Sequence, residues 1–387
     1  MEATFWISLA IIFYAFLGYG IIILIITKIK RLLSKAPQLD TETALPSVTF
    51  VVPCYNELDM IDQKIQNCLA LDYPKEKYEI IFITDGSTDG TPDAVKKYPE
   101  IKLLHDDIRG GKSSAENRAM KYVNSEITIF SDANTVLPTN ALKKMMRHYA
   151  NPKVGAVSGE KRIQTKSSDK AVGAGEGIYW KYESFLKKLD SELNTIVGAA
   201  GELISFRTSL FEHVEKDTIL DDFMLSMRIA AKGFRVIYEP EAYALETASA
   251  SIKEELKRKI RICAGGWQAM SRLLPILWPF PNPVLTFQYI SHRVLRWSIV
   301  PVLLIVVFIT NYYLALNSSL YMIIFNLQII FYLGALLGYL LEKYNIKLKV
   351  LFIPYYFSIM NYSVIMGFIR FLKGSQSAAW ERSQRSK

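Results

Sequence analysis

Hydrophobic residues are distributed unevenly along this chain. Residues 5–27 are almost free of charge, and residues 299–316, 320–341 and 350–372 have a similar character. A run of about 20 apolar residues is long enough to cross the hydrocarbon core of a bilayer as a helix. Between the first and second runs lies a long segment of ordinary mixed composition. The pattern predicts an integral membrane protein with an inserted globular domain.

Within the globular segment, short apolar runs alternate with stretches that carry apolar residues at helical spacing. Strands are predicted at residues 48–52, 78–83, 101–104 and 126–130. Helices are predicted at residues 58–71, 92–98 and 112–124. This alternation indicates right-handed βαβ units and a mostly parallel sheet. Ligands of such sheets bind outside the carboxyl ends of the strands, so the polar residues that follow each strand are the candidates for a site.

The first apolar segment is predicted to be an uncleaved anchor instead of a secretory signal. Its apolar run is longer than a signal core, it begins with Glu2, and no small-residue cleavage site follows. Lys28, Lys30, Arg31 and Lys35 follow it directly, so the positive-inside rule places the globular domain in the cytoplasm. We expect a plasma membrane protein. Its net charge of +9 is explained by basic flanks that meet anionic lipid, and nucleic acid is not an expected partner.

Composition also divides the chain into regions. The predicted regions are an N-terminal transmembrane helix (1–28), a linker (29–46), the globular domain (47–270), an interfacial segment (271–298), a C-terminal membrane region (299–372) and a basic tail (373–387). Three full crossings after the domain would place the basic tail outside, against the positive-inside rule. Residues 350–372, which include Pro354 and Asn361, are therefore predicted to be re-entrant or interfacial.

The strand at 126–130 runs into Asp132, Ala133 and Asn134. Two oxygen-bearing side chains two residues apart on a turn can face one hard cation. Mg²⁺ or Mn²⁺, held by one or two carboxylates plus substrate phosphates, suits this arrangement. The alternative is an Asx turn that only ends the strand.

Two further clusters follow the first and second strands. Tyr55, Asn56 and Glu57 offer a planar aromatic ring and an amide that can hold a nucleobase. Alternatively, Asn56 caps the helix that follows. Asp85 ends the second strand, where a carboxylate can accept hydrogen bonds from a base or a ribose. The alternative is that the glycines after Asp85 make only a tight turn.

A third cluster, Arg109 to Lys112, precedes the helix at 112–124. Backbone amides at a helix start, together with two cations, suit a diphosphate. A P-loop would need glycine at position 106, where the chain has Asp106, so a Walker motif is excluded.

Taken together, these motifs resemble a known family. VVPCYNE, ITDGSTDGT, RGGKSSAEN and SDANT, in this order and spacing, look like the nucleotide-sugar half of a family 2 glycosyltransferase. GAAGELISFRTSLF, LDDFMLSMRIAAKGFRVIYEPEA and RKIRICAGG look like its acceptor half. The flanking apolar segments resemble those of the membrane-integrated, polysaccharide-synthase-like members. The resemblance implies an α/β fold of the GT-A (Rossmann-like) type, with a cytosolic catalytic domain and flanking transmembrane helices.

The resemblance also implies roles for individual residues. The nucleotide donor would be bound by Pro53, Tyr55, Asn56, Glu57, Asp85, Lys112, Asp132, Arg258 and Arg261. The metal would be held by Asp132, with Asn134 standing where the family usually has a second aspartate. Asp222, beside Asp221, occupies the position of the family's catalytic base. The acceptor would meet Gly201, Glu202 and Trp267.

One departure from the family concerns processivity. Processive synthases usually carry Q/R-x-x-R-W, and here Arg258 and Arg261 match while Ile262 replaces the tryptophan. Trp267 is a candidate to compensate, and the alternative for it is an interfacial anchor. Processive and single transfer therefore both stay open.

The chemistry of sugar transfer accounts for these residue types. Negative charge develops on the leaving phosphate, which a metal and Lys112 can stabilise. Asp222 can take the proton of the acceptor hydroxyl from the opposite face of the sugar, which inverts the anomeric centre. Its alternative role is to cap the helix at 223–232. We expect a nucleotide-sugar donor, a glycan or lipid-linked acceptor and room for accessory or export subunits. Transfer to a polyprenyl phosphate and a catalytically silent nucleotide-sugar-binding subunit are the alternatives.

Overall fold

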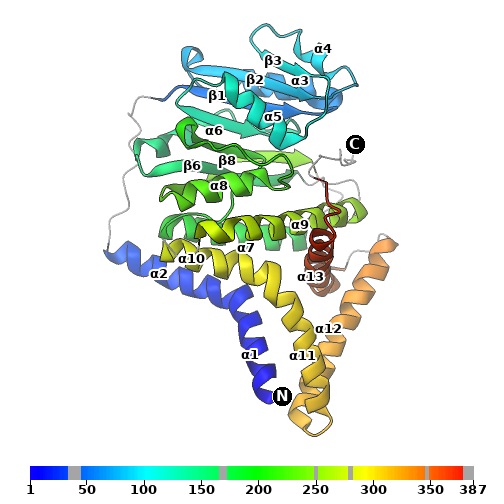
Figure 1. Cartoon of the computed structure of the whole chain (residues 1–387). Helices are drawn as coiled ribbons and strands as arrows, with labels where there is room; N and C mark the ends of the chain where they lie inside the picture. The colour runs from blue at the N-terminus through cyan, green and yellow to red at the C-terminus, as the bar shows by residue number, and fades with distance from the viewer. Residues whose placement is uncertain (34–44, 165–171, 248–251, 278–281, 345–347, 378–387) are drawn as a thin grey trace.

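The computed structural model of this chain describes residues 1–33, 45–164, 172–247, 252–277, 282–344 and 348–377. A mixed β-sheet with covering helices stands over a group of long apolar helices, and two helices, α7 and α9, lie in a layer between them (Figure 1). Most of the predicted linker (29–46) falls on residues 34–44, outside the described residues.

The sheet has eight strands in the order β3-β2-β1-β4-β7-β6-β8-β5. The strands are β1 Val48–Cys54, β2 Tyr78–Asp85, β3 Lys102–Asp106, β4 Ile127–Ser131, β5 Thr135–Val136, β6 Val154–Gln164, β7 Leu203–Arg207 and β8 Arg235–Thr247. β3, β2, β1 and β4 are parallel, as expected from the sequence. β7 runs antiparallel to β4 and β6, so the second half of the sheet is mixed. The α/β fold predicted from the sequence is confirmed.

Helices cover both faces of the sheet. α3 Leu58–Leu69, α4 Thr91–Val95 and α6 Ala141–Met146 pack on one face, and α5 Lys112–Ala119 and α8 Asp221–Ala231 pack on the other. β1 shows why both faces are buried. Phe50 and Val52 belong to one core and Val51 to the other, because successive side chains of a strand point to opposite faces.

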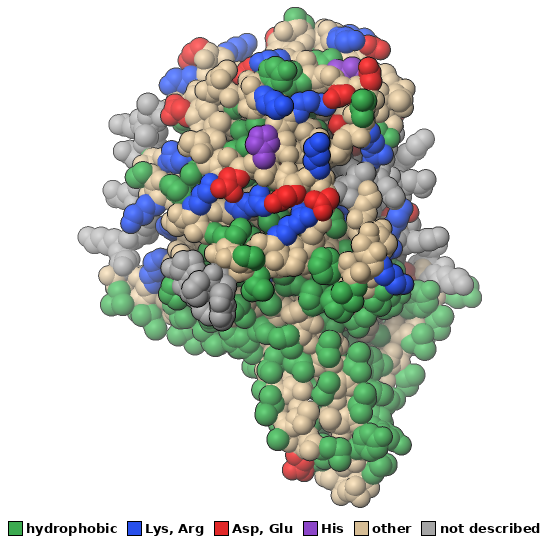
Figure 2. Space-filling view, viewed as in Figure 1, with side chains coloured by type: hydrophobic (Ala, Val, Ile, Leu, Met, Phe, Trp, Pro, Cys, Tyr) green, Lys and Arg blue, Asp and Glu red, His purple; other side chains and the backbone are tan. Residues whose placement is uncertain are grey.

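The intermediate layer consists of α7 Val172–Leu193 and α9 Ile252–Leu277. Beyond it lie α1 Glu2–Phe13, η1 Tyr14–Gly18, α2 Tyr19–Leu33, α10 Pro283–Tyr289, η7 Ile290–Ile299, α11 Val300–Ala315, α12 Ser319–Lys343 and α13 Lys349–Leu372. Four helical segments are long and apolar enough to span a membrane: Glu2–Leu33, Pro283–Ala315, Ser319–Glu342 and Val350–Leu372. Figure 2 shows apolar side chains covering the surface of this region. These helices support integration into a membrane.

The second of these segments begins earlier than the sequence analysis placed it. α10, η7 and α11 form one continuous helical segment from Pro283 to Ala315, so the predicted interfacial segment (271–298) runs directly into the membrane helix. The third and fourth segments agree with the predicted apolar runs. α13 packs along α9 and also contacts α7 and α12. It is one helix of 24 residues with Pro354 inside it.

Candidate active site

The turn between β4 and β5 carries Asp132 and Asn134, and it is held from beneath by α3. Lys64 of α3 is buried, and its Nζ donates hydrogen bonds to Ser131 Oγ at 2.8 Å and to the carbonyl and hydroxyl oxygens of Thr135, each at 3.0 Å. Thr135 Oγ1 in turn donates to the Asp132 carbonyl at 2.9 Å. Lys64 therefore fixes the backbone from which Asp132 and Asn134 project.

Lys112, the first residue of α5, lies among three carboxylates. Its Nζ donates to Asp132 Oδ1 at 2.8 Å and lies 3.6 Å from Asp221 Oδ2 and 3.8 Å from Glu116 Oε1. Burial opposes the charged form of Lys112, but Asp132 and Asp221 together hold its pKa well above the usual value. One ammonium group thus joins the turn after β4 to the start of α8.

Asp221 and Asp222, which begin α8, have different electrostatic surroundings. Lys112 lowers the pKa of Asp221, against the effect of burial. Burial, and then the neighbouring Asp221, raise the pKa of Asp222 to about 7. A carboxyl with a pKa near 7 is suited to accept a proton at neutral pH.

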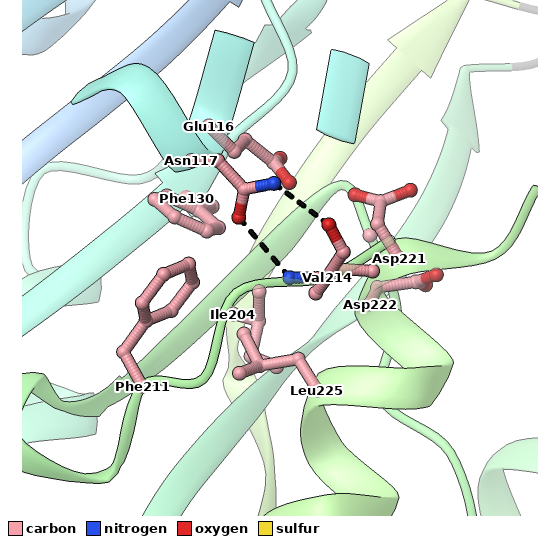
Figure 3. A pocket seen from close by; sticks show the side chains of 10 residues that line it. Glu116, Asn117, Phe130, Ile204, Phe211, Val214, Asp221, Asp222 and Leu225 are labelled. Atoms are coloured by element: carbon pink, nitrogen blue, oxygen red, sulfur yellow. Dashed lines mark hydrogen bonds between the residues drawn. The ribbon is translucent and has the colours of Figure 1, made fainter. Parts of the chain in front are cut away.

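Glu116 of α5 lies near these two aspartates, as Figure 3 shows. Burial, and then Asp221, raise the pKa of Glu116 well above its usual value. Its neighbour Asn117 donates to the Val214 carbonyl at 2.7 Å and accepts from the Val214 amide at 3.1 Å. These two hydrogen bonds tie α5 to the segment that leads into α8.

Asp222 also borders a cavity of about 230 Å³ on the side of the domain that faces the apolar helices. Its wall is built by β6, β8, the segment before β7, α7, α8, α9, η7 and α13. Gly201 contacts Asp222 closely, since a Cβ on Gly201 would lie 3.0 Å from Asp222 Oδ2. Glu202 lines the same cavity and pairs with Lys161. Burial alone would raise the pKa of Glu202, but the Lys161 ammonium outweighs this effect and lowers that pKa to about 2. The structure therefore brings Gly201 and Glu202 to Asp222.

On the other side of Lys112, a narrow hollow is lined by Pro53, Tyr55, Asp85, Arg109 and Lys112, among others. The Arg109 guanidinium stacks over the Tyr55 ring, 3.7 Å from its centroid. Asp85 accepts hydrogen bonds from the backbone amides of Gly110 at 3.1 Å and Gly111 at 2.7 Å. These two amides, expected from the sequence to face a diphosphate, instead hold Asp85 here.

Asn56 and Glu57 join two loops. Asn56 adopts a left-handed backbone with a φ of 52° and accepts a hydrogen bond from the Thr88 amide at 2.8 Å. The residue that caps α3 is Glu57, whose own amide donates to Thr91 Oγ1 at 3.0 Å. Asn56 therefore ties the turn after β1 to the turn after β2, and it does not cap α3 as the alternative suggested.

The three α9 residues singled out from the sequence lie in different surroundings. Arg258 lines the cavity and donates to Glu255 Oε2 at 3.1 Å. Arg261 lies close enough to Asp221 to help lower its pKa. Trp267 packs on Phe368 of α13 with ring centroids 4.4 Å apart and ring planes inclined by 39°, and it is not among the described residues that line the cavity. In this structure Trp267 joins α9 to α13.

Asp132 and Asn134 are the candidates to hold a divalent cation. Asn134 Nδ2 donates to Glu246 Oε1 at 2.8 Å, while its buried Oδ1 has no hydrogen-bond partner among the described residues. Within those same residues, no group of three or more His, Cys, Asp or Glu side chains is arranged as a metal site. The Asp132 carboxylate and the unpartnered Asn134 oxygen are of the ligand type that suits a cation taking its remaining ligands from substrate phosphates and water.

Sequence reasoning missed several residues of the site. These are Lys64 beneath the turn, Glu116 beside Asp221, and the cavity residues Lys161, Trp180, Glu183, Lys187, Tyr238 and Trp297. They come from separate helices and strands without a shared motif. A charged residue inside an apolar helical face, as at Lys64, was the one local signal available.

Comparison with known proteins agrees with the fold. Residues 49–215 match the family model described as glycosyl transferase family 2. The poly-beta-1,6-N-acetyl-D-glucosamine synthase of Staphylococcus aureus strain MSSA476 is 30% identical over 253 residues, which cover 63% of this chain and 60% of that protein. The synthase of the same name from Staphylococcus epidermidis strain ATCC 35984 is 30% identical over 240 residues, covering 60% of this chain and 57% of that protein. The chain thus spans about 60% of the length of these curated relatives.

A solved structure matches almost the whole chain. The mannosyltransferase PcManGT from Pyrobaculum calidifontis, in complex with GDP-Man and Mn²⁺, aligns with a TM-score of 0.72 and 24% identity. The alignment covers 97% of this chain and 99% of that one, so the likeness in fold includes the apolar helices as well as the sheet. Residues 49–215 of this chain therefore match the glycosyl transferase family 2 model, and the chain shares its fold with this solved structure, including flanking helices long and apolar enough to span a membrane.

Proposed function

We propose that this protein is an inverting glycosyltransferase, which moves a sugar from a nucleotide-diphosphate sugar to a glycan or lipid-linked acceptor at a membrane. The observation that carries the proposal is the position of Asp222. It borders the 230 Å³ cavity, and its neighbour Asp221 lies 3.6 Å from Lys112, which binds Asp132. Lys112 lines the proposed nucleotide hollow and Asp222 lines the proposed acceptor cavity, so the two are linked through the contact between Lys112 and Asp221.

The chain's own residues suit the chemistry of transfer. The Lys112 ammonium is positioned to stabilise negative charge on the leaving diphosphate. Asp132 and Asn134 would hold Mg²⁺ or Mn²⁺, which neutralises phosphate charge when bound. Asp222 takes the proton from the acceptor hydroxyl as that oxygen attacks the anomeric carbon opposite the diphosphate, and the configuration inverts. Its pKa of about 7 makes this transfer efficient at neutral pH.

Donor, orientation and acceptor belong to the same proposal. UDP-sugars are the first donor class to test, and N-acetylglucosamine is the first sugar because the curated relatives make a polymer of it. GDP-mannose is a second donor to test, because the solved structure of the same fold is a complex with GDP-Man. Lys28, Lys30 and Arg31 after the first apolar segment favour a cytoplasmic domain at the plasma membrane. Accessory or export subunits are compatible with a membrane-bound synthase.

The test uses the full chain in lipid nanodiscs with a panel of UDP, GDP and TDP sugars, with and without Mn²⁺. Mass spectrometry should detect donor hydrolysis or transfer with at least one donor. Asp222→Asn should lower the rate of both reactions by about 10²–10⁴-fold while nucleotide binding persists. Asp217→Asn, at an exposed carboxylate, is the matched control and should stay active. A protein that binds nucleotide but gives neither reaction with any donor and acceptor would favour the catalytically silent subunit.

Metal binding has its own readout. Calorimetric titration of Mn²⁺ in the presence of UDP should give saturable binding, weakened about tenfold or more by Asp132→Asn because a carboxylate ligand is lost. Asp93→Asn removes an exposed carboxylate on α4 and should leave binding unchanged. Equal Mn²⁺ affinity in wild type and Asp132→Asn would remove Asp132 from the metal site.

A further inference from the structure

The cavity beside Asp222 is rich in basic side chains. Those that line it are Lys161, Lys187, Arg258, Lys259 and Arg293. Lys161 pairs with Glu202 and Glu246, Arg258 and Lys259 pair with Glu255, and Arg293 pairs with Glu183. Four of the five cations are therefore neutralised by carboxylates of the protein itself.

Lys187 of α7 is different. No carboxylate of the described residues lies within ion-pair distance of its Nζ, and its ammonium instead lies 5.9 Å from the centroid of the Tyr238 ring. Burial lowers the pKa of Lys187, and the more distant Glu183 only partly offsets this. Lys187 is half-buried, and a partly desolvated cation without a counter-ion is destabilised, so the site favours an anion that supplies the missing charge.

The position of Lys187 suggests where that anion comes from. Trp180, Ser184 and Lys187 line the cavity from one face of α7, at the spacing of successive helical turns. The same cavity is bordered by Asp222 of α8 and by Met360 of α13. In Figure 1, α7 lies between the sheet domain and the apolar helices. A ligand that fills the cavity therefore extends from the proposed base toward the membrane region.

We propose that Lys187 binds an anionic group, a phosphate or a carboxylate, on the acceptor whose hydroxyl is presented to Asp222. This inference rests on the proposed function, because it specifies the acceptor class of the same cavity. Aromatic walls from Trp180, Tyr238 and Trp297 accommodate a sugar ring or an apolar chain beside that group. The two sources of the anion are the phosphate of a lipid-linked acceptor and the carboxylate of an acidic sugar.

The test measures direct binding of three probes that share a decyl chain: decyl phosphate, decyl β-glucuronide and the neutral decyl β-glucoside. The full chain in nanodiscs is titrated by microscale thermophoresis. We expect wild type to bind at least one anionic probe about tenfold or more tightly than the neutral probe, as for a charge-assisted contact away from bulk water. Preference for decyl phosphate identifies a phosphate-bearing acceptor, and preference for the glucuronide identifies an acidic sugar.

Variants at position 187 test the assignment. Lys187→Met should remove the preference for the anionic probe and leave binding of the neutral probe unchanged, while Lys187→Arg should retain most of the preference. Lys188→Met, at the exposed next residue of α7, is the matched control. Equal binding of all three probes by wild type, or a preference that survives in Lys187→Met, overturns the proposal.

Binding is read without turnover, so the two proposals fail separately. Absence of donor hydrolysis and transfer with every sugar would refute the proposed function. The preference for anionic probes would still be measured separately, by titration. Conversely, if the enzyme is active but binds the anionic and neutral probes equally, only the proposed role of Lys187 is refuted. Nucleotide affinity should be equal in wild type and Lys187→Met, since Lys187 does not border the nucleotide hollow.

Discussion

The two adjacent aspartates at the start of α8 have pKa values shifted in opposite directions because their neighbours differ. Asp221 lies 3.6 Å from the Lys112 ammonium, which favours its charged form. Asp222 is turned to the cavity, where burial and the charge of Asp221 favour the neutral form. The charge held on Asp221 thus raises the proton affinity of the residue that we propose as the base.

This arrangement predicts a pH profile. Asp222 has a pKa of about 7 and acts only when unprotonated, so kcat/KM should fall about tenfold per pH unit below 7 and level off above it. Asp222→Asn should lower the rate by about 10²–10⁴-fold. Asp221→Asn removes the neighbouring negative charge, lowers the pKa of Asp222 and should move the inflection to lower pH. The measurement is kcat/KM across a pH range on both sides of 7. An inflection at the same pH in wild type and Asp221→Asn would contradict the assignment of Asp222 as the base.

A second prediction concerns the support of the turn that we propose to bind a metal. Lys64→Met removes the donor to Ser131 and Thr135 and leaves their buried oxygens without it, at a cost of about 1–3 kcal/mol. The turn that carries Asp132 should become less rigid. Both the free energy of unfolding and the Mn²⁺ affinity in the presence of UDP should therefore decrease. Denaturant unfolding and calorimetry measure the two quantities. Lys96→Met, at an exposed lysine, is the control. An unchanged free energy of unfolding and an unchanged Mn²⁺ affinity in Lys64→Met would show that the turn does not depend on Lys64.

At the scale of elements, the sequence predicted what local patterns encode. β1, β2, β3 and β4 are continuous apolar runs, and the residues after each strand meet at one edge because the strands are parallel. The cavity had no such signal, since Trp180, Tyr238 and Trp297 reach it from three elements far apart in the chain. The family resemblance gave Trp267 as an acceptor residue, with an interfacial anchor as the alternative, and in the structure it packs on Phe368. Which face of α9 meets the cavity depends on the docking of α13, which periodicity alone does not give.

The contact between α9 and α13 can be tested at a glycine. A Cβ on Gly367 would lie 2.5 Å from Cys263 Cβ and 2.8 Å from the Ala264 amide nitrogen, so Gly367→Ala must push the two helices apart. We expect the free energy of unfolding to decrease by about 1–3 kcal/mol and the thermal midpoint of the nanodisc-bound protein to fall. Gly334→Ala is the control, because its Cβ would lie 3.6 Å from Pro354 at ordinary contact distance. Equal midpoints for the two variants would mean that α9 and α13 separate freely.

At the scale of the whole molecule, the N-terminal helix is docked to the intermediate layer. Lys30 Nζ donates to the Glu192 and Leu193 carbonyls at 2.8 and 2.7 Å, at the end of α7. Arg31 pairs with the Glu192 side chain. The basic residues that indicate orientation by the positive-inside rule thus also hold the domain against the membrane region. These contacts thereby hold α7, which lines the cavity through Lys187, against the N-terminal helix.

That docking makes the membrane topology testable with single cysteines. The native Cys54, Cys68 and Cys263 are buried and should not react with a membrane-impermeant maleimide. If the domain is cytoplasmic, Asn317→Cys between α11 and α12 should be labelled in intact cells, and Asn124→Cys in the domain only after permeabilisation. Because α13 packs along α9 in the intermediate layer, we expect Ser377→Cys to behave like the domain position. Labelling of Ser377→Cys from outside would instead make α13 a full crossing, and labelling of Asn124→Cys in intact cells would reverse the orientation.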